Sequence, residues 1–231
     1  MSALYASCNG IQAVSVAFTI GWLGTWCADV MLPAAGPLPT AGGAVALSVA
    51  TLAMVGTVFR QDAFAGQQRA RIVGGFGGWQ KLLTARCYDM PGGVSLAMLL
   101  NDAALEVGEQ VSGAPSGTVG VRFERQGAPA TRLLRQLVGR QWWMSSAGVT
   151  QFGARPTSPV KTPGLVEDYD GGLGKAIIST EDPASWLPGA MFGTGTPFQS
   201  DLIDQALTVS SMSLAMPADG RMRLTVLTRA A

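Results

Sequence analysis

The part of this chain that most restricts its fold is residues 56–88, GTVFRQDAFAGQQRARIVGGFGGWQKLLTARCY. It reads as β-strands interrupted by glycine turns, with basic residues spaced along the strands. It contains no plausible set of catalytic side chains. We therefore interpret the chain as a structural part that neighbouring subunits contact, and we weigh other functions against that interpretation.

Other segments extend the β pattern towards both ends of the sequence. Large apolar residues alternate with small or polar ones in residues 13–20 and again in residues 44–50, and alternation of this kind is typical of strands with one apolar face. Asn9-Gly10 and Asp219-Gly220 are strong two-residue hairpin signals. Many short strands at near-regular spacing predict a small barrel or sandwich.

The periodicity changes to 3.6 in the middle of the chain. Apolar residues with helical spacing predict one helix over residues 94–107 and a second over residues 129–138, followed by a hairpin around Trp142. Residues 151–174 are rich in Pro, Gly and short polar residues, which favours a long loop or a linker.

The fold class expected from these patterns is mainly β. It comprises two small β-barrel-like domains, or half-barrels, with a small two-helix α/β insertion. We expect an N-terminal barrel-like domain over residues 1–90 and the insertion over residues 91–153. A loop and C-terminal strands that complete a second barrel follow over residues 154–231.

The charge balance argues for a protein surface that is partly buried in an assembly. The chain has 16 Lys and Arg against 15 Asp and Glu, for a net charge of +1, so no global basic field predicts nucleic-acid binding. Only 13% of its residues are charged, against about 25% in an average soluble domain. One explanation is simply a composition rich in Gly and Ala; the second is a surface covered by neighbouring subunits.

The reactive residue types give little support to catalysis or metal binding. The chain has no His, which removes the commonest general base and metal ligand, so we expect no cofactor and no metal. Its three Cys are far apart in the sequence and lack CxxC spacing, which predicts buried thiols in a reducing compartment. We expect no signal peptide. The apolar residues 11–32 and 41–59 carry polar residues or alternate, so we favour strands over a membrane span.

Three motifs suggest different chemistry. The run VGGFGGW at residues 73–79 resembles a phosphate loop, but a strand rather than a helix is expected after it. Ser158 and Lys161 match a bare SxxK spacing, without the companion motifs of the penicillin-binding enzymes. The acidic residues Glu167, Asp168 and Asp170 could serve glycan hydrolysis or hold Ca²⁺, against the simpler interpretation of a solvated loop.

The candidate site residues are interface residues. The arginines Arg60, Arg69 and Arg71 fit ordinary surface charge, ion pairs to a neighbouring subunit or, less well, a nucleic-acid stripe. Trp79 and Trp142 are candidate interface anchors, unless both are core residues. Trp142 and Trp143 would point to opposite faces of a strand.

Several of these segments together resemble the tail-baseplate proteins of tailed bacteriophages, and in particular the baseplate hub family. The segments are TIGWLGTWCADVML, the 56–88 block, ALEVGE, LLRQLVGRQWWMSSAGVTQFG, the LPG of residues 187–189 and ADGRMRLTVL. The order is also similar: a barrel, a small helix-containing insertion, then further barrel strands.

This resemblance implies a virion protein of the tail baseplate, assembled in the host cytoplasm. It implies a homo-oligomeric ring, usually a trimer with pseudo-sixfold barrels, that joins the tail tube to the central spike without catalytic residues. The chain is short for a two-barrel hub, so a distal tail or spike-adjacent protein is the nearest competing hypothesis. Two more hypotheses stay open: a cell-wall-degrading tail enzyme that uses Glu167 or Asp170, and a protein that inserts residues 11–59 into a membrane.

Overall fold

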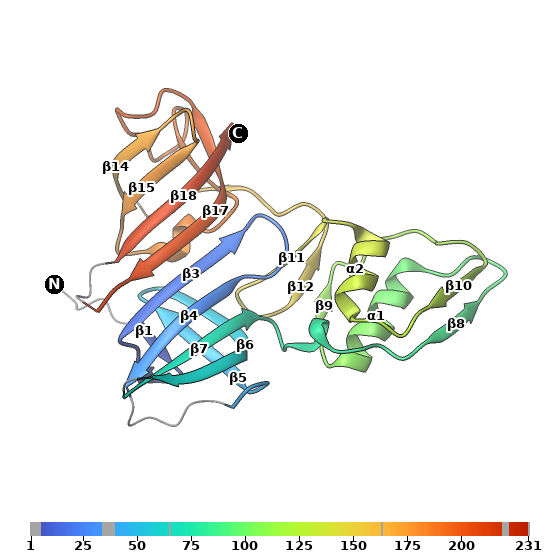
Figure 1. Cartoon of the computed structure of the whole chain (residues 1–231). Coiled ribbons are helices and arrows are strands. Elements are labelled where there is room, and N and C mark those ends of the chain that lie inside the picture. The colour runs from blue at the N-terminus through green and yellow to red at the C-terminus, as the bar shows by residue number, and fades with distance from the viewer. Residues whose placement is uncertain (1–5, 34–39, 65, 163, 219–221, 231) are drawn as a thin grey trace.

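The computed structural model describes residues 6–33, 40–64, 66–162, 164–218 and 222–230. It is mainly β, as the sequence predicted, and Figure 1 shows two β lobes side by side with a smaller helical unit that projects away from them. We call these parts the N-lobe (β1–β7), the α/β unit (β8–β12, α1 and α2) and the C-lobe (β13–β18). The predicted domain boundaries at residues 90 and 153 stay a prediction.

The N-lobe is a strongly curved antiparallel sheet around an apolar core. Its strands are β1 (Ala6–Cys8), β2 (Ile11–Gln12), β3 (Ser15–Gly21), β4 (Cys27–Pro33), β5 (Ala44–Val49), β6 (Leu52–Phe64) and β7 (Gln67–Gly74). The predicted hairpin at Asn9-Gly10 joins β1 to β2, and both turn residues have positive φ (50° and 79°). The alternation seen in the sequence buries every second residue of β3, β4 and β5.

Trp26 fills the centre of the N-lobe, and two glycines make room for it. Its ring stacks on Phe18 with 5.0 Å between ring centroids. A Cβ at Gly74 would lie 2.5 Å from Trp26 Nε1, and a Cβ at Gly56 would lie 2.7 Å from Trp26 Cη2. The backbones of β6 and β7 therefore approach the indole at a distance that only glycine allows.

The C-lobe is a second curled sheet. Its strands are β13 (Ser158–Pro159), β14 (Leu165–Asp170), β15 (Lys175–Ser179), β16 (Ala190–Gly193), β17 (Ala206–Met216) and β18 (Arg223–Ala230), with a short 3₁₀ helix over Pro183–Trp186. Trp186 is fully buried and packs edge-on against Phe192 and Phe198. The predicted turn Asp219-Gly220 lies outside the described residues, but β17 and β18 pair antiparallel on either side of it.

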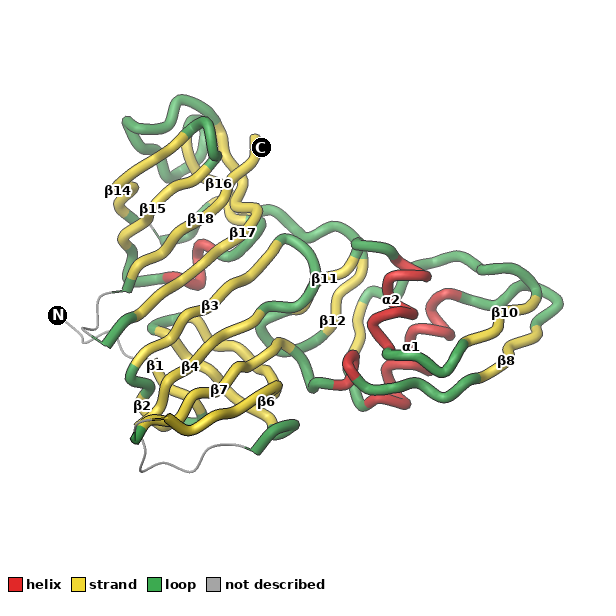
Figure 2. The backbone as a smooth tube through the Cα atoms, viewed as in Figure 1, coloured by secondary structure: helices red, strands yellow, loops and turns green. Residues whose placement is uncertain are grey.

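The strand β17 joins the two lobes. Its first part, Ala206 to Thr208, pairs with β16, and after a bulge its second part, Ser211 to Met216, pairs antiparallel with β3 of the N-lobe. The guanidinium of Arg229 on β18 also lies over the Trp22 ring, 3.7 Å from its centroid. One antiparallel run therefore crosses both lobes in the order β14-β15-β18-β17-β3-β4-β7-β6, as Figure 2 shows.

The α/β unit contains both predicted helices. The elements are β8 (Arg86–Asp89), α1 (Leu96–Val107), β9 (Val111–Ser112), β10 (Arg122–Arg125), α2 (Ala130–Val138), β11 (Trp142–Met144) and β12 (Thr150–Phe152). Ser95 caps the start of α1, and Gly108 ends it with a φ of 78°. Neither helix that the described ranges contain has the length and apolar character that a membrane crossing requires.

Three local expectations are corrected. Residues 151–174 are not a structureless linker, because they contain β13 and β14, and Val166 on β14 is buried against the C-lobe core. The segment after the glycine-rich run begins with a 3₁₀ helix, Gly78–Gln80, and becomes a strand only at Arg86. Cys27 and Cys87 are exposed, since both occupy outward positions on strands, and only Cys8 is buried.

Candidate assembly surfaces

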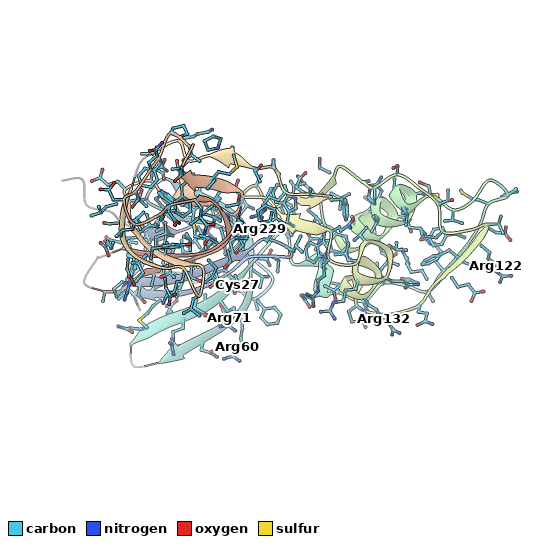
Figure 3. All side chains as sticks on the ribbon, turned by 90° about the horizontal axis from the view of Figure 1, so that it is seen from above. Cys27, Arg60, Arg71, Arg122, Arg132 and Arg229 are labelled. Carbon is cyan, nitrogen blue, oxygen red and sulfur yellow. The ribbon has the colours of Figure 1, made fainter. Side chains whose placement is uncertain are left out.

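The three arginines predicted at an interface lie on one outward face, where β4, β7 and β6 run side by side. Arg69 and Arg71 alternate along β7 with the buried Ala70 and Ile72. Arg60 on β6 is the register partner of Arg71. Figure 3 shows Arg60 and Arg71 on the same side of the β lobes, far from Arg122 and Arg132 on the α/β unit. The structure thus brings these candidates together, and their role at an interface stays a prediction.

Two acidic residues on this face pair with two of the three arginines. Arg71 donates to Asp29 with both Nε and Nη2, at 2.8 and 2.7 Å, and these hydrogen bonds lower the pKa of Asp29. Arg60 Nη2 lies 3.3 Å from Asp62 Oδ2. Arg69 forms no ion pair with any residue that the structure describes. All of these side chains are exposed, so the pairs contribute little to stability and remain available to a partner.

A β-bulge sets the shape of this surface. The register between β6 and β7 shifts between Val58 and Arg60, so Phe59 has no register partner, and it is 55% exposed. Phe59 borders an open groove of about 790 Å³ that crosses β3, β4 and β7 and is lined by small and apolar residues, by the three arginines and by Asp29 and Asp62. The surface therefore combines one aromatic ring with several exposed charges, a combination that suits contact with another protein.

Trp79 is a core residue, which corrects its prediction as an interface anchor. It is 4% exposed, and its Nε1 donates to Thr150 Oγ1 at 2.8 Å. The run of glycines before it holds no phosphate-binding helix terminus, because only the short 3₁₀ helix follows. The backbone of this run instead lies close to the end of α1, where a side chain would not fit: a Cβ at Gly78 would lie 2.5 Å from the carbonyl oxygen of Val107.

Glu109, which the sequence reasoning did not single out, ties this glycine loop to the end of α1. Its carboxylate accepts hydrogen bonds from Phe76 N at 3.2 Å and Gly78 N at 2.5 Å. Burial raises the pKa of Glu109, and the backbone N–H donors oppose that rise. Lys81 Nζ also donates to the carbonyl of Val107 at 3.0 Å. The α/β unit is therefore joined to the loop that follows β7 of the N-lobe by polar contacts, of which the one between Glu109 and Gly78 N is buried.

A second group of charges that the sequence reasoning missed holds the α/β unit together internally. Arg125 on β10 has a side chain that is 1% exposed, and it donates to Asp102 Oδ2 at 3.0 Å, to Glu106 and to the carbonyl of Thr84 at 3.1 Å. Arg86 Nη1 reaches Asp102 Oδ1 at 2.5 Å. The spacing of Asp102 and Glu106 at i and i+4 on a helix was the available signal.

The predicted anchor Trp142 is half-buried, and it packs against the core at the joint of the α/β unit. Its neighbour Trp143 lies under the guanidinium of Arg155, 4.4 Å from carbon Cζ to the ring centroid. Burial lowers the pKa of Arg155 to about 10. Both tryptophans therefore serve the fold of this chain, and a further role of Trp142 at an interface stays a prediction.

The acidic cluster lies on β14, at the outer edge of the C-lobe. Glu167, Asp168 and Asp170 are all exposed, and β14 pairs only with β15 among the strands that the structure describes. A second β-bulge falls between Val166 and Asp168. The cluster is thus part of an open strand edge, whereas the simpler interpretation from the sequence was a solvated loop.

Sequence comparison and structure comparison give different results for this chain. No family model and no curated protein matches it by sequence. In contrast, it is similar to an Escherichia coli protein described as a component of the type VI secretion system, which itself resembles the T4 tail proteins gp27 and gp5. The TM-score is 0.71 at 9% identity, over 98% of this chain and 76% of that one.

Two further solved structures show the same likeness. One is a 43 kDa tail protein of prophage MuSo2 from Shewanella oneidensis, with a TM-score of 0.66 and 11% identity over 97% of both chains. The other is a tail protein from Neisseria meningitidis MC58, with a TM-score of 0.61 and 12% identity over 99% of this chain and 96% of that one. The chain has the β-rich fold of phage tail proteins along nearly its whole length, which confirms the predicted resemblance at the level of fold.

Proposed function

We propose that this chain is a structural subunit of a phage tail baseplate, and within it the hub that joins the tail tube to the central spike. The observation that carries the proposal is the presence of two β lobes in one chain, joined edge to edge by β17 and β3. Three copies of such a chain supply six lobes. A ring of this kind matches a sixfold tube on one side and a trimeric spike on the other.

The surface chemistry supports a role in assembly. The face formed by Arg60, Arg69 and Arg71 combines charges with the exposed Phe59, and burying such a face between copies fits the low overall charge of the chain. Its partners on this proposal are further copies of itself, the tail tube and the spike. Its location is the virion tail, after assembly in the host cytoplasm, and it acts without catalysing a reaction.

One comparison favours a second location for the same role. The first of the similar structures is described as a component of the type VI secretion system, so a tail-like secretion apparatus is the second candidate assembly. On this second proposal the chain would have the same physical task there, as a ring between a tube and a spike.

The test is the absolute mass of the purified protein by light scattering behind a sizing column, alone and with a co-expressed spike protein. We expect a species of three times 23.9 kDa, or a monomer that forms a stoichiometric complex with the spike. A monomer that ignores the spike would contradict the hub and would favour a distal tail or other baseplate position. Clearing of peptidoglycan that Glu167→Gln abolishes would replace the structural role by an enzymatic one.

A further inference from the structure

The antiparallel run that crosses both lobes has an open strand edge at β14 and another along the second part of β6, whose first part continues the sheet into β5, β1 and β2. At one end, the part of β6 beyond its bulge, from Arg60 to Phe64, pairs with β7 but has no strand on its other side among the described residues. At the other end, β14 pairs with β15 alone in the part of the chain that the structure describes. Open edges present unpaired N–H and C=O groups, which are a template for pairing with another chain. The two edges are similar in length, since one spans residues 60–64 and the other residues 165–170.

The two ends of this run carry opposite net charge when the strand next to the β6 edge is included. The β6 edge and the strand beside it carry Arg60, Arg69 and Arg71 against the single acid Asp62, which is the register partner of Arg69, so this end has a net positive charge. The β14 edge carries Glu167, Asp168 and Asp170. Charges and bulges on an edge are also ordinary protection against aggregation. Protection alone would be served by the same sign at both ends, whereas opposite net charges favour pairing of β6 with β14, and the three acids disfavour pairing of β14 with a second β14.

The strand directions agree with such a pairing. Every neighbour in the run from β14 to β6 is antiparallel, so the strands alternate in direction and the first and last run opposite ways. If the ring axis lies roughly along the strands, the rotation that relates one copy to the next leaves each strand pointing the same way along that axis. The β6 edge of one copy therefore meets the β14 edge of the next copy in the antiparallel sense that the rest of the sheet uses.

We propose that copies of this chain assemble head to tail by strand pairing between the Arg60–Phe64 edge of β6 and the Leu165–Asp170 edge of β14 in the next copy. The outward faces then continue from copy to copy, with Arg60 on the same face as Asp168 and Asp170. Two exposed apolar side chains become covered in the joint: Phe59, which directly precedes the β6 edge, and Leu165, the first residue of the β14 edge. This inference deepens the proposed function and rests on it, because both require a ring.

The test is a charge exchange read out by mass. We make Arg60→Glu with Arg69→Glu, then Asp168→Lys with Asp170→Lys, and finally all four changes in one chain. We expect each pair alone to weaken association by about tenfold or more and the fourfold variant to recover it, because the signs are then exchanged and again complementary. Recovery also shows that the changed chain folds.

A matched control makes the same kind of charge reversal at two arginines that lie away from both edges. Arg132→Glu with Arg135→Glu changes two arginines on α2, away from both edges, and should leave the ring intact (Figure 3 shows the position of Arg132). As an independent readout, the amides of residues 60–64 and 165–170 should exchange hydrogen about tenfold more slowly, or slower still, in the assembled form than at a dilution that gives monomers.

The outcomes separate the two proposals. A ring that persists in both reversed pairs, with unchanged exchange at the two edges, overturns the β6–β14 joint while the hub survives with another interface. A wild-type chain that stays monomeric at every concentration, with and without the spike, overturns both.

Discussion

The two β lobes and the α/β unit keep their shapes by different means. The lobes bury alternate residues of each strand in an apolar core, and the ion pairs of the β4–β7–β6 face lie in solvent. The α/β unit instead encloses a charged network around Arg125 and attaches to the N-lobe through the buried Glu109. Asp29 and Asp182 in the lobes also have lowered pKa values, but neither is paired with a buried cation, so the stability of the lobes should depend less on pH than that of the α/β unit.

The largest effect is expected from a substitution in the apolar core of the N-lobe. Trp26→Ala removes a fully buried ring that lies against Phe18, Gly56 and Gly74, and we expect a loss of about 3–5 kcal/mol in the free energy of unfolding. Denaturant unfolding measures the loss, and reaction of the buried Cys8 with a thiol reagent reports opening of this lobe. A loss below about 1 kcal/mol would show that the lobe is not built around Trp26.

A smaller and more local effect is expected from Arg125→Met, which leaves Asp102 and Glu106 without their buried partner. We expect a loss of about 2–3 kcal/mol, confined to the α/β unit. Hydrogen exchange should accelerate along α1 and stay unchanged along β4 and β7. Equal acceleration in both parts would mean that the lobes and the α/β unit unfold as one body.

Acid should destabilise the α/β unit more than the lobes in the wild-type chain. Burial by itself raises the pKa of Asp102, but hydrogen bonds from Tyr88 and Arg86 and the charge of Arg125 outweigh it, so that this pKa is lowered. The backbone N–H of Thr84 is the first cause of the lowered pKa of Glu106. A lowered folded-state pKa gives stability above the unfolded value of about 4, which is lost as the pH falls further.

We therefore expect the α/β unit to lose exchange protection below about pH 4, before the lobes do. Protection factors corrected for the intrinsic rate at each pH measure this. Glu109 has the opposite sign, because its raised pKa favours proton uptake in the folded state, so it does not contribute to the acid loss. Arg125→Met should weaken the pH dependence of exchange protection in the α/β unit. If the lobes and the α/β unit of the wild-type chain lost protection at the same pH, the proposed difference between them would be contradicted.

The smallest effect is expected at the exposed pair of Arg71 and Asp29. Arg71→Ala should leave the midpoint of unfolding unchanged, because both side chains are more than half exposed and the pair is screened by solvent. A clear shift of the midpoint would show that this face supports the lobe and is not simply available for contacts.

The same contrast explains how much of the fold the sequence could predict. The alternation of Phe18 and Ile20 on one strand, and of Leu47 and Val49 on another, predicts strands because burial on one side of a strand has period two. Both helices follow from their apolar periodicity, and Gly108 marks the end of the first. The expectation of a long ordered loop or a linker over residues 151–174 is wrong for the part that forms β13 and β14, because the Pro and Gly content hides the short apolar signal of Val166.

The site was harder to predict than the fold. Arg60, Arg69 and Arg71 could be grouped because they share one strand hairpin, and alternation places them on one face. Trp79 shows the opposite case, because a tryptophan after glycines does not reveal whether another element covers it, and here Thr150, 71 residues later in the chain, lies against it. Contacts such as that of Glu109 with the glycine loop depend on tertiary structure and leave no pattern in one sequence.

The pairing of β3 with β17 also has a consequence for the order in which the molecule forms. Gly21 meets Ser211 and Val16 meets Met216, so strands near opposite ends of the described chain must find each other before the lobes are joined. During synthesis, the edge of β3 is therefore open until residues 211–216 have left the ribosome. Such distant pairings slow folding and expose strand edges to other nascent copies. We therefore expect that rapid overproduction of this protein leads to misfolding or aggregation at the step in which β3 pairs with β17.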